Sequence, residues 1–379
     1  MPASYAFATE ALIYTQPDRW NGDILVSLKR RLWLVLILPV LLFLVGLTGG
    51  CSSMSAYSFS PQFDPDSKTF QHLNGYRDDK SVGDLLSMAW QFMTRETDPI
   101  EKTGFPVMSA ADNAQRDADK AAITWIGHAT LLFERDGKTI LTDPMFSDRA
   151  SPLAFSGPKR VAPPARSLEG LPPIDVVLIS HAHYDHLDMP SLRRLAELQP
   201  DIEVLVPLGV GRYASDAGFA NVTELDWWQH AIVGDMNVTA TPARHWASRT
   251  PFDRNRTLWA GFMMRFSDGF QFFFVGDTGY GDDFANVRDR LGPADLAAIP
   301  IGAYAPRDFM KASHCNPQEA VQIFQDLGAG RAVAIHWGTF KLTLEPLDET
   351  PILLGAALRQ ACIDEGRFRA LVHGERWTF

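Results

Sequence analysis

The run His181-Ala182-His183-Tyr184-Asp185-His186 places three imidazoles and one carboxylate within six residues. Neutral imidazole nitrogen and carboxylate oxygen are ligands that zinc binds in proteins. The intervening Ala182 and Tyr184 are small or planar, so a tight loop can turn every ligand inward. Histidines also cluster on exposed loops by chance, and a single His-x-His would carry little weight. The added Asp and third His at this spacing indicate a metal site.

The residues around this run predict how it is positioned. Val176–Ser180 is short, apolar and β-branched and follows Pro172-Pro173, which is typical of a buried strand in a sheet covered on both faces. A helix is expected over Ser191–Leu198 after Pro190. The metal-binding run should therefore emerge where a strand ends and a loop begins.

Three other residues of ligand type follow strand-like runs in the same way. His245 comes after Val238–Thr241, Asp277 after the return strand of a hairpin that ends at Val275, and His336 after Ala332–Ile335. In layered α/β folds the loops at strand ends converge on one edge, where chemistry collects. The pattern predicts that these residues join the metal site. Asp143 also ends a strand, and two roles stay open for it: holding a neighbouring ligand or capping a turn.

The remaining pattern predicts alternating strands and helices. The expected strands lie at Ile123–Phe133 (interrupted at Gly127-His128), Thr139–Leu141 after an Asp136-Gly137 turn, Glu203–Val206, Val222–Leu225, Trp259–Phe266 and Leu296–Ile301. The expected helices lie at Asp84–Met93, Gly209–Ala217 and Pro317–Leu327. A polar surface connection is expected over Ala110–Lys120.

Composition narrows the class of protein. The chain has 379 residues, 46% of them hydrophobic, so it can build a large core. The net charge is −10 and no dense basic stripe occurs, which argues against nucleic acid as a partner. The three cysteines, Cys51, Cys315 and Cys362, form no CxxC motif. Export from the cytosol would allow a Cys315–Cys362 disulfide.

The N-terminal region resembles a secretory segment. Lys29-Arg30-Arg31 precedes an apolar run, Leu32–Leu47, broken only by Pro39, and small residues then lead to Cys51. The leading interpretation is a bacterial lipoprotein acylated on Cys51, and the alternative is an uncleaved helical anchor. Both place the protein in the bacterial cell envelope, on the membrane, with its body facing away from the cytoplasm. We expect a membrane segment over 1–50, a leader packing on the core over 51–120 and a hydrolase domain over 121–379.

The metal-binding residues, together with longer stretches, resemble a known family. His181 to His186, His245, Gly276-Asp277-Thr278 and His336 are similar to the metal signature of the metallo-β-lactamase superfamily. Seven stretches resemble its N-acyl-phosphatidylethanolamine-hydrolysing phospholipase D branch: TWIGHAT (124–130), LTDPMF (141–146), LPPIDVVLISHAHYDHLD (171–188), ELDWW (224–228), FVGDTGY (274–280), DLAAIPIGAY (295–304) and AIHWGTF (334–340). The resemblance implies an αββα sandwich, two mixed β-sheets with helices on the outer faces and metals at one edge.

The resemblance also implies a ligand set for two Zn²⁺ ions per chain. His181, His183 and His245 would hold one ion, Asp185, His186 and His336 the second, and Asp277 would bridge both. Asp185 would also orient the attacking oxygen. His314 would contact substrate, whereas structural hydrogen bonding is at least as good an interpretation for His128 and His373.

The implied reaction is phospholipase D-type hydrolysis of an N-acyl-phosphatidylethanolamine-like lipid, in which hydroxide from a water shared by two metals attacks phosphorus. The products would be phosphatidate and an N-acylethanolamine, and the anchor would place the site at a membrane surface. Ala305 and Asp308 depart from the family pattern near the expected substrate mouth. The alternatives are another hydrolase on the same metals (a sugar-phosphate lactonase, a thioesterase or a β-lactamase) or a non-enzymatic metal-binding envelope protein.

Overall fold

The computed structural model describes residues 57–72, 76, 78, 80–108 and 121–379, which belong to one compact unit. The predicted membrane segment, Cys51 and the predicted connection over Ala110–Lys120 lie outside the described residues. Among the helices that are described, none is both long enough and apolar enough to cross a bilayer.

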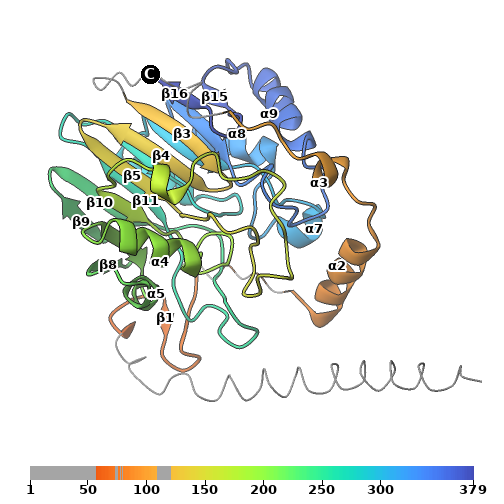
Figure 1. Ribbon diagram of the computed structural model, residues 1–379, viewed down its shortest axis with the longest axis horizontal. Coiled ribbons are helices and arrows are strands. Elements are labelled where there is room, and N and C mark those ends of the chain that lie inside the picture. The colour runs from red at the N-terminus through yellow and green to blue at the C-terminus, as the bar shows by residue number, and fades with distance from the viewer. Residues whose placement is uncertain (1–56, 73–75, 77, 79, 109–120) are drawn as a thin grey trace, which may run out of the picture. The chain divides into compact units, whose positions relative to one another are not determined.

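Two seven-stranded mixed sheets form the centre of the molecule (Figure 1). The first has the order β16-β3-β4-β5-β6-β7-β8, with strands β3 (Ala122–Gly127), β4 (Thr130–Arg135), β5 (Lys138–Thr142), β6 (Val176–Leu178), β7 (Glu203–Pro207), β8 (Asn221–Leu225) and β16 (Arg376–Thr378). The second has the order β15-β14-β13-β12-β11-β10-β9, with strands β9 (His230–Val233), β10 (Met236–Thr241), β11 (Gly261–Arg265), β12 (Gln271–Phe274), β13 (Leu296–Pro300), β14 (Arg331–Ile335) and β15 (Phe368–Arg369).

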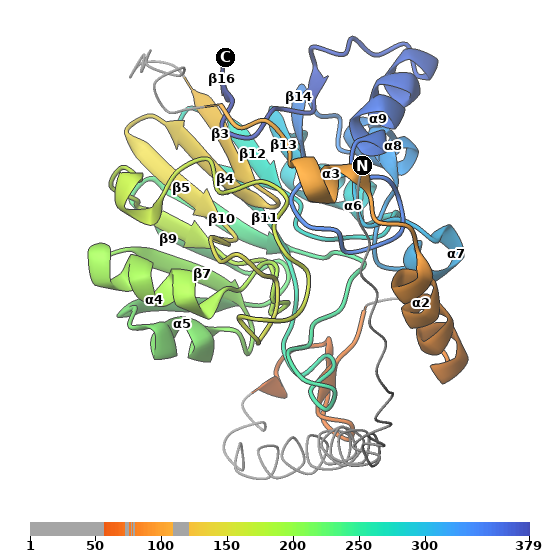
Figure 2. The same ribbon diagram turned by 45° about the vertical axis from the view of Figure 1, so that its right-hand side comes forward.

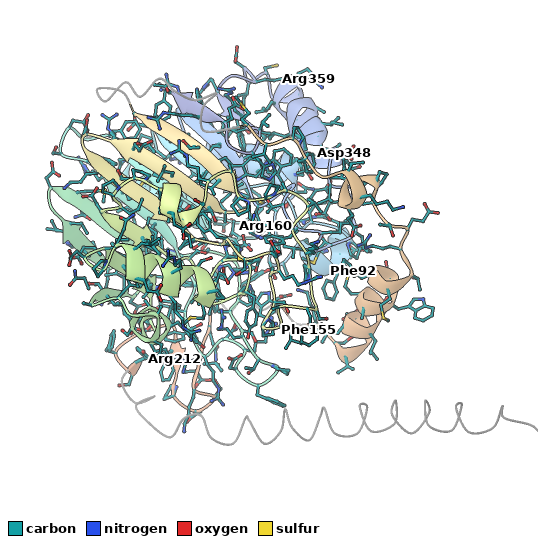
Figure 3. All side chains as sticks on the ribbon, in the orientation of Figure 1. Phe92, Phe155, Arg160, Arg212, Asp348 and Arg359 are labelled. Atoms are coloured by element: carbon teal, nitrogen blue, oxygen red, sulfur yellow. The ribbon has the colours of Figure 1, made fainter. Side chains whose placement is uncertain are left out.

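The sheets face each other across an apolar core, and their side chains fill the space between them (Figure 3). Phe133 of β4 and Phe272 of β12, one from each sheet, have ring centroids 4.5 Å apart, and both are fully buried. Each buried aromatic side chain of this kind contributes roughly 1.5–3 kcal/mol through the hydrophobic effect. The fold is therefore held mainly by the contact between the two sheets.

Helices cover the outer faces (Figure 2). Helices α4 (Met189–Leu198) and α5 (Gly211–Ala217) lie on the first sheet, and α8 (Pro317–Asp326) packs on β13 beside α6 (Asp283–Leu291) and α9 (Glu349–Gln360). The remaining elements are α2 (Val82–Thr94), α3 (Pro99–Thr103), α7 (Arg307–Met310), the 3₁₀ turn Leu168–Gly170 and the small hairpin of β1 (Phe63–Asp64) and β2 (Thr69–Phe70). The predicted αββα sandwich is confirmed.

Most predicted elements are present, with ends shifted by a few residues. The run interrupted at Gly127-His128 is the hairpin of β3 and β4, and the Asp136-Gly137 turn joins β4 to β5 with positive φ at both residues, 49° and 71°. The sequence pattern did not predict β9, β15, β16, α6 or α9, nor the short elements β1, β2, α3 and α7. Strand β9 is short and mostly exposed, so it lacks a clear apolar alternation.

The Cys315–Cys362 disulfide that export would allow does not form. Cys315 is fully buried and its thiol donates a hydrogen bond to the Pro300 carbonyl at 3.0 Å. Cys362 is exposed just after α9, and both cysteines are free. The core position of Cys315 separates the two thiols, which sequence spacing alone does not reveal.

Contacts of the leader hold it against the sandwich. Asp98 caps α3, accepts a hydrogen bond from the Leu347 amide at 2.8 Å and pairs with the buried Lys341 ammonium at 3.3 Å. Phe70 of β2 is fully buried. These contacts bear on the site because they hold Lys341, which lies in the loop that follows His336, five residues after it.

Candidate metal centre

The parallel strands of both sheets deliver polar residues to one edge of the sandwich. Strands β5 and β6 pair in parallel in one sheet, and β12, β13 and β14 pair in parallel in the other. Asp143 and His181 follow β5 and β6, whereas Asp277 and His336 follow β12 and β14. His245 follows β10 in the same way. The structure thus brings together the strand-end residues that the sequence singled out.

Backbone strain marks the same edge. His128, Asp143 and His336 have φ values of 55°, 34° and 61°, a region that side chains other than glycine rarely adopt. Gly302 permits the turn at His336, because a Cβ atom there would lie 2.1 Å from the His336 carbonyl oxygen. A backbone keeps such an unfavourable conformation only where the contacts around it hold it firmly in place.

One cluster of three imidazoles comes from two loops. His181 Nε2 lies 2.8 Å from His183 Nδ1, and His245 Nε2 lies 3.2 Å from the same atom. The three ligand-type atoms are all within 4.8 Å of one another.

A second cluster combines a carboxylate with imidazoles. Asp185 Oδ2 lies 3.4 Å from His186 Nε2, 3.3 Å from His336 Nε2 and 2.9 Å from His128 Nε2. These four residues also form a group whose atoms lie within 4.8 Å of one another.

Asp277 lies between the two clusters. Its Oδ2 atom is 3.0 Å from His336 Nε2 and 3.2 Å from His186 Nε2 on one side, and 3.7 Å from His245 Nε2 and 4.0 Å from His181 Nε2 on the other. A single carboxylate oxygen therefore faces both groups of imidazoles.

Neighbouring groups fix the orientation of the imidazole rings. His186 Nδ1 donates to Asp143 at 2.6 Å, His181 Nδ1 donates to the Ser180 hydroxyl at 2.9 Å, and His245 Nδ1 donates to the Ser313 carbonyl at 2.9 Å. Each ring then carries its proton on Nδ1 and turns the Nε2 lone pair towards the centre. Two roles were left open for Asp143, and the structure shows the first of them, contact with a neighbouring residue of the site, His186.

Burial and charge set the protonation of the centre. Burial lowers the pKa of His183 to about 3 and that of His245 to about 4, because the surrounding core disfavours the charged imidazolium. Burial also lowers the pKa of His336, but the carboxylates of Asp277 and Asp185 outweigh it and raise that pKa to about 9. Burial raises the pKa of Asp277, but His186 and His336 hold it well below the usual range. The imidazoles of His183 and His245 in the first cluster are therefore neutral, whereas the surroundings of His336 in the second cluster favour positive charge.

The donor set fits metal ions. Among the described residues, no hydrogen-bond partner of acceptable geometry meets His186 Nε2, a buried atom that lies 3.2 Å from Asp277 Oδ2. Buried polar atoms without a partner are rare, and lone pairs that converge within 4.8 Å would be satisfied by cations. The site therefore fits the metal dependence that the sequence analysis predicts.

The three additional histidines have different surroundings. His314 lies at the rim, with Nδ1 4.0 Å from Asp277 Oδ2 and its side chain 12% exposed. His128 donates to Asp185 from inside the second cluster. His373 lies away from the centre, where its ring stacks on Trp125 at 4.1 Å and its Nε2 atom is 3.0 Å from the Thr339 hydroxyl.

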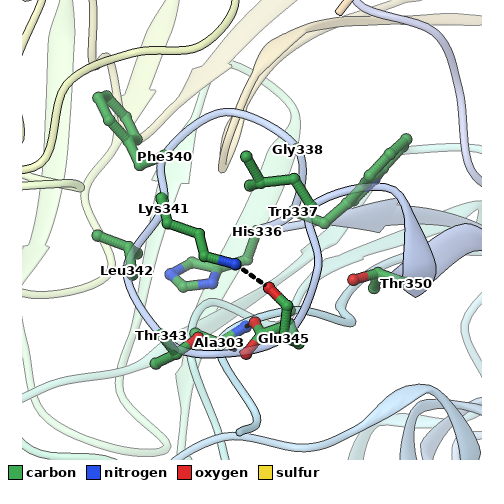
Figure 4. A pocket seen from close by; sticks show the side chains of 12 residues that line it. Ala303, His336, Trp337, Gly338, Phe340, Lys341, Leu342, Thr343, Glu345 and Thr350 are labelled. Carbon is green, nitrogen blue, oxygen red and sulfur yellow. Dashed lines mark hydrogen bonds between the residues drawn. The ribbon is translucent and has the colours of Figure 1, made fainter. Parts of the chain in front are cut away.

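Two cations that support the site were not found from sequence. Arg249 donates hydrogen bonds to the carbonyls of Ala182 and Leu187, at 2.9 and 2.8 Å, and so holds both ends of the run His181–His186. Lys341 lies in the loop that follows His336, and Figure 4 shows its ammonium group directed at the Glu345 carbonyl. Arg249 binds backbone carbonyls of a distant loop, and Lys341 also pairs with the distant Asp98 carboxylate, so no local motif identifies these cations.

Comparisons with known proteins agree with this geometry. Residues 138–337 match the sequence family described as the β-lactamase superfamily domain. The chain is 40% identical over 269 residues to the N-acyl-phosphatidylethanolamine-hydrolyzing phospholipase D 1 of Caenorhabditis elegans, covering 67% of this chain and 74% of that protein. It is 34% identical over 278 residues to the mitochondrial protein of that activity from Saccharomyces cerevisiae, covering 68% and 59% of the two chains.

A solved structure supports the fold. The metallo hydrolase of Ignicoccus hospitalis superposes with a TM-score of 0.52 at 20% identity, covering 69% of this chain and 98% of that chain.

Proposed function

Since the chain belongs to the N-acyl-phosphatidylethanolamine-hydrolysing phospholipase D family of the metallo-β-lactamase superfamily and is a metal-dependent hydrolase, we propose that it is a zinc-dependent phosphodiesterase for N-acyl-phosphatidylethanolamine-like lipids. The observation that supports this most is the position of Asp277 Oδ2 between two clusters of ligand-type atoms. Such an arrangement suits a pair of metal ions that act together on one phosphodiester.

In this proposal each cluster holds one zinc ion. His181, His183 and His245 would hold the first ion, Asp185, His186 and His336 would hold the second, and Asp277 would contact both. When bound, the two ions supply hydroxide near neutral pH by lowering the pKa of water, and they neutralise charge on the phosphodiester oxygens.

The protein's own groups orient the reactants. The His128 N–H donates to Asp185 Oδ2, which fixes the carboxylate that orients the attacking oxygen. Burial holds the pKa of His314 well below its usual value, so this rim imidazole is neutral and can donate one N–H to a phosphate oxygen. The Arg307 guanidinium donates to the His314 carbonyl at 2.7 Å and holds the residue in place.

The bond changes follow from a phosphodiester substrate. Hydroxide oxygen bonds to phosphorus while the bond from phosphorus to the N-acylethanolamine oxygen breaks. That oxygen gains a proton, and the products are phosphatidate and the N-acylethanolamine.

We also propose that the N-terminal segment anchors the enzyme in the bacterial envelope. The support is the basic triplet Lys29-Arg30-Arg31 before the apolar run Leu32–Leu47. Fractionation of cells that express wild type or Cys51→Ser tests the lipoprotein form, since only acylation requires the thiol.

The test of the reaction is a lipid-product assay. Zinc-loaded full-length protein is added to vesicles that contain N-acyl-phosphatidylethanolamine, beside an Asp277→Asn control, and products are identified by mass spectrometry. Release of N-acylethanolamine by wild type alone supports the proposal. A folded, metal-loaded protein that releases none contradicts it, and hydrolysis of a lactone or thioester panel then identifies the alternative reaction.

A further inference from the structure

Helix α2 turns little of its surface towards the protein, since Met88 and Phe92 are its only residues that are not exposed, and its polar residues lie along one side. Asp84, Ser87, Gln91 and Thr94 recur at helical spacing and form one stripe. Three of them, Asp84, Ser87 and Gln91, line an open pocket of about 450 Å³ shared with residues of α7. A helix on a globular protein normally buries its apolar stripe, whereas most of the apolar residues of α2 are exposed.

The opposite face is apolar and exposed to water. It presents five large side chains, with exposed fractions of 72% for Val82, 52% for Leu85, 66% for Leu86, 65% for Trp90 and 73% for Met93. No residue of the helix is buried. A contiguous exposed apolar patch on a soluble body usually marks an interaction site.

Contacts on both sides of α2 prevent the helix from rolling inward. Before the helix, Asp78 accepts a hydrogen bond from the Ser313 hydroxyl at 2.7 Å and Lys80 lies over the Phe309 ring at 4.6 Å. After it, Arg95 pairs with Glu101 at 2.6 Å, and Asp98 pairs with Lys341. The apolar face is therefore held outward by the fold.

We propose that this apolar face of α2 docks on a lipid bilayer and brings the metal centre to its substrate. The choice of a bilayer rests on the proposed function, because the scissile phosphate then lies at a membrane surface. The position of the helix agrees: Ser313, which binds Asp78 through its hydroxyl, accepts the hydrogen bond of His245 through its carbonyl. Ser313 thus joins the centre to the segment that precedes the docking helix.

The size and charge of the face favour a bilayer over a second protein. A 13-residue helix is about 20 Å long and 10 Å wide, so half of its surface offers roughly 300 Å². A stable protein complex buries about 800 Å² per partner. The only charged residue of α2 is Asp84, which lies on the pocket side, so the docking face is uncharged. An uncharged face with a Trp suits the boundary between head groups and acyl chains.

The experiment measures where the face lies when the full-length, zinc-loaded chain is reconstituted in vesicles. Cys51 and Cys362 are replaced with serine, and a nitroxide is attached through Leu86→Cys or, separately, Trp90→Cys. The matched control is Ile352→Cys on α9, a helical apolar residue that is 66% exposed, as Leu86 is. The electron paramagnetic resonance spectrum of each nitroxide is recorded with oxygen, which dissolves in lipid, and with a nickel complex, which dissolves in water. The broadening that each reagent causes is then compared.

We expect oxygen to broaden the labels at positions 86 and 90 more than nickel does, and the reverse order at position 352. Equal exposure to nickel at all three positions overturns the proposal. Protection of positions 86 and 90 from both reagents also overturns the proposal. If the labels of two copies then broaden each other's spectra by dipolar coupling, the face belongs to a dimer interface. If they do not, another segment of the chain covers the face. No substrate is used, so a failure of docking is distinguished from a failure of the proposed reaction.

Discussion

The metal centre and helix α2 reverse the usual distribution of polarity in opposite senses. The centre places imidazoles and carboxylates in the core, where His186 and Asp277 are almost completely buried. Helix α2 places leucine, tryptophan and methionine in water. Each arrangement is unfavourable for the isolated folded chain, so each indicates something outside the chain that completes it.

The two regions differ in how firmly the fold holds them. Every imidazole in the two clusters comes from a loop at a strand end, and Asp143, Ser180 and Ser313 restrain three of the rings. The docking face of α2 makes few contacts, and only the segments before and after it are attached. Substitutions in the centre should therefore change chemistry strongly, whereas those on α2 should leave the free protein almost unchanged.

The largest effect is expected for Asp277→Asn. The amide keeps the shape of the side chain but removes the charge that faces both clusters, so turnover should fall roughly a thousandfold or more, equivalent to about 4 kcal/mol of transition-state stabilisation. The measurement is the initial rate of lipid hydrolysis, with circular dichroism to verify the fold. Activity within about tenfold of wild type would remove Asp277 from the proposed ligand set.

His336→Ala tests whether the two clusters bind separate metal ions. The variant removes an imidazole from the second cluster and leaves His181, His183 and His245 intact, so bound zinc should fall from about two towards about one per chain. Elemental analysis of the dialysed protein measures this ratio. His373→Ala is the control, because that buried imidazole lies outside both clusters and should leave the zinc content unchanged. Two full equivalents in His336→Ala would contradict the proposed ligands.

Asp143→Asn tests whether the hydrogen bonds that orient the candidate ligands contribute to metal affinity. Asp143 accepts hydrogen bonds from His186 and from the Ser180 hydroxyl, and outer groups of this kind typically change metal affinity by about 10–100-fold. We expect a loss in that range in a competition titration with a chelator. Asp226→Asn is the matched control, since Asp226 is also a buried carboxyl with a raised pKa, caused mainly by burial, but accepts from the Trp227 amide instead. Equal affinities in the two variants would show that Asp143 acts only on the turn.

The grouping of the candidate ligands was largely predictable because these residues follow local patterns. A buried strand such as Val176–Leu178 has an apolar run, and His181 follows it directly. The contact of Asp143 with His186 was undecided, since it depends on how loops 43 residues apart meet. Arg249 was missed for the same reason, because its guanidinium binds backbone carbonyls of another loop.

The exposure of the apolar face of α2 was not predictable either. The spacing of apolar residues over Asp84–Met93 correctly predicts a helix, but spacing does not say which face turns towards the body. That depends on the contacts of Asp78, Lys80 and Asp98 with distant parts of the chain. A periodic pattern fixes the type of an element, whereas tertiary contacts fix its rotation.

The smallest effect is expected for Leu86→Ala, measured as the free energy of unfolding in urea for the free, metal-loaded protein. Leu86 is 66% exposed and truncation creates no cavity, so the change should stay within about 0.5 kcal/mol. The matched variant is Leu354→Ala on α9, where the leucine is 2% exposed and the cost should be about 2–5 kcal/mol. A cost above about 2 kcal/mol for Leu86→Ala, in the range of core truncations, would show that the face is already covered in the free protein. The contrast between a largely buried centre and a water-exposed docking helix would then fail, and with it the need for a bilayer partner.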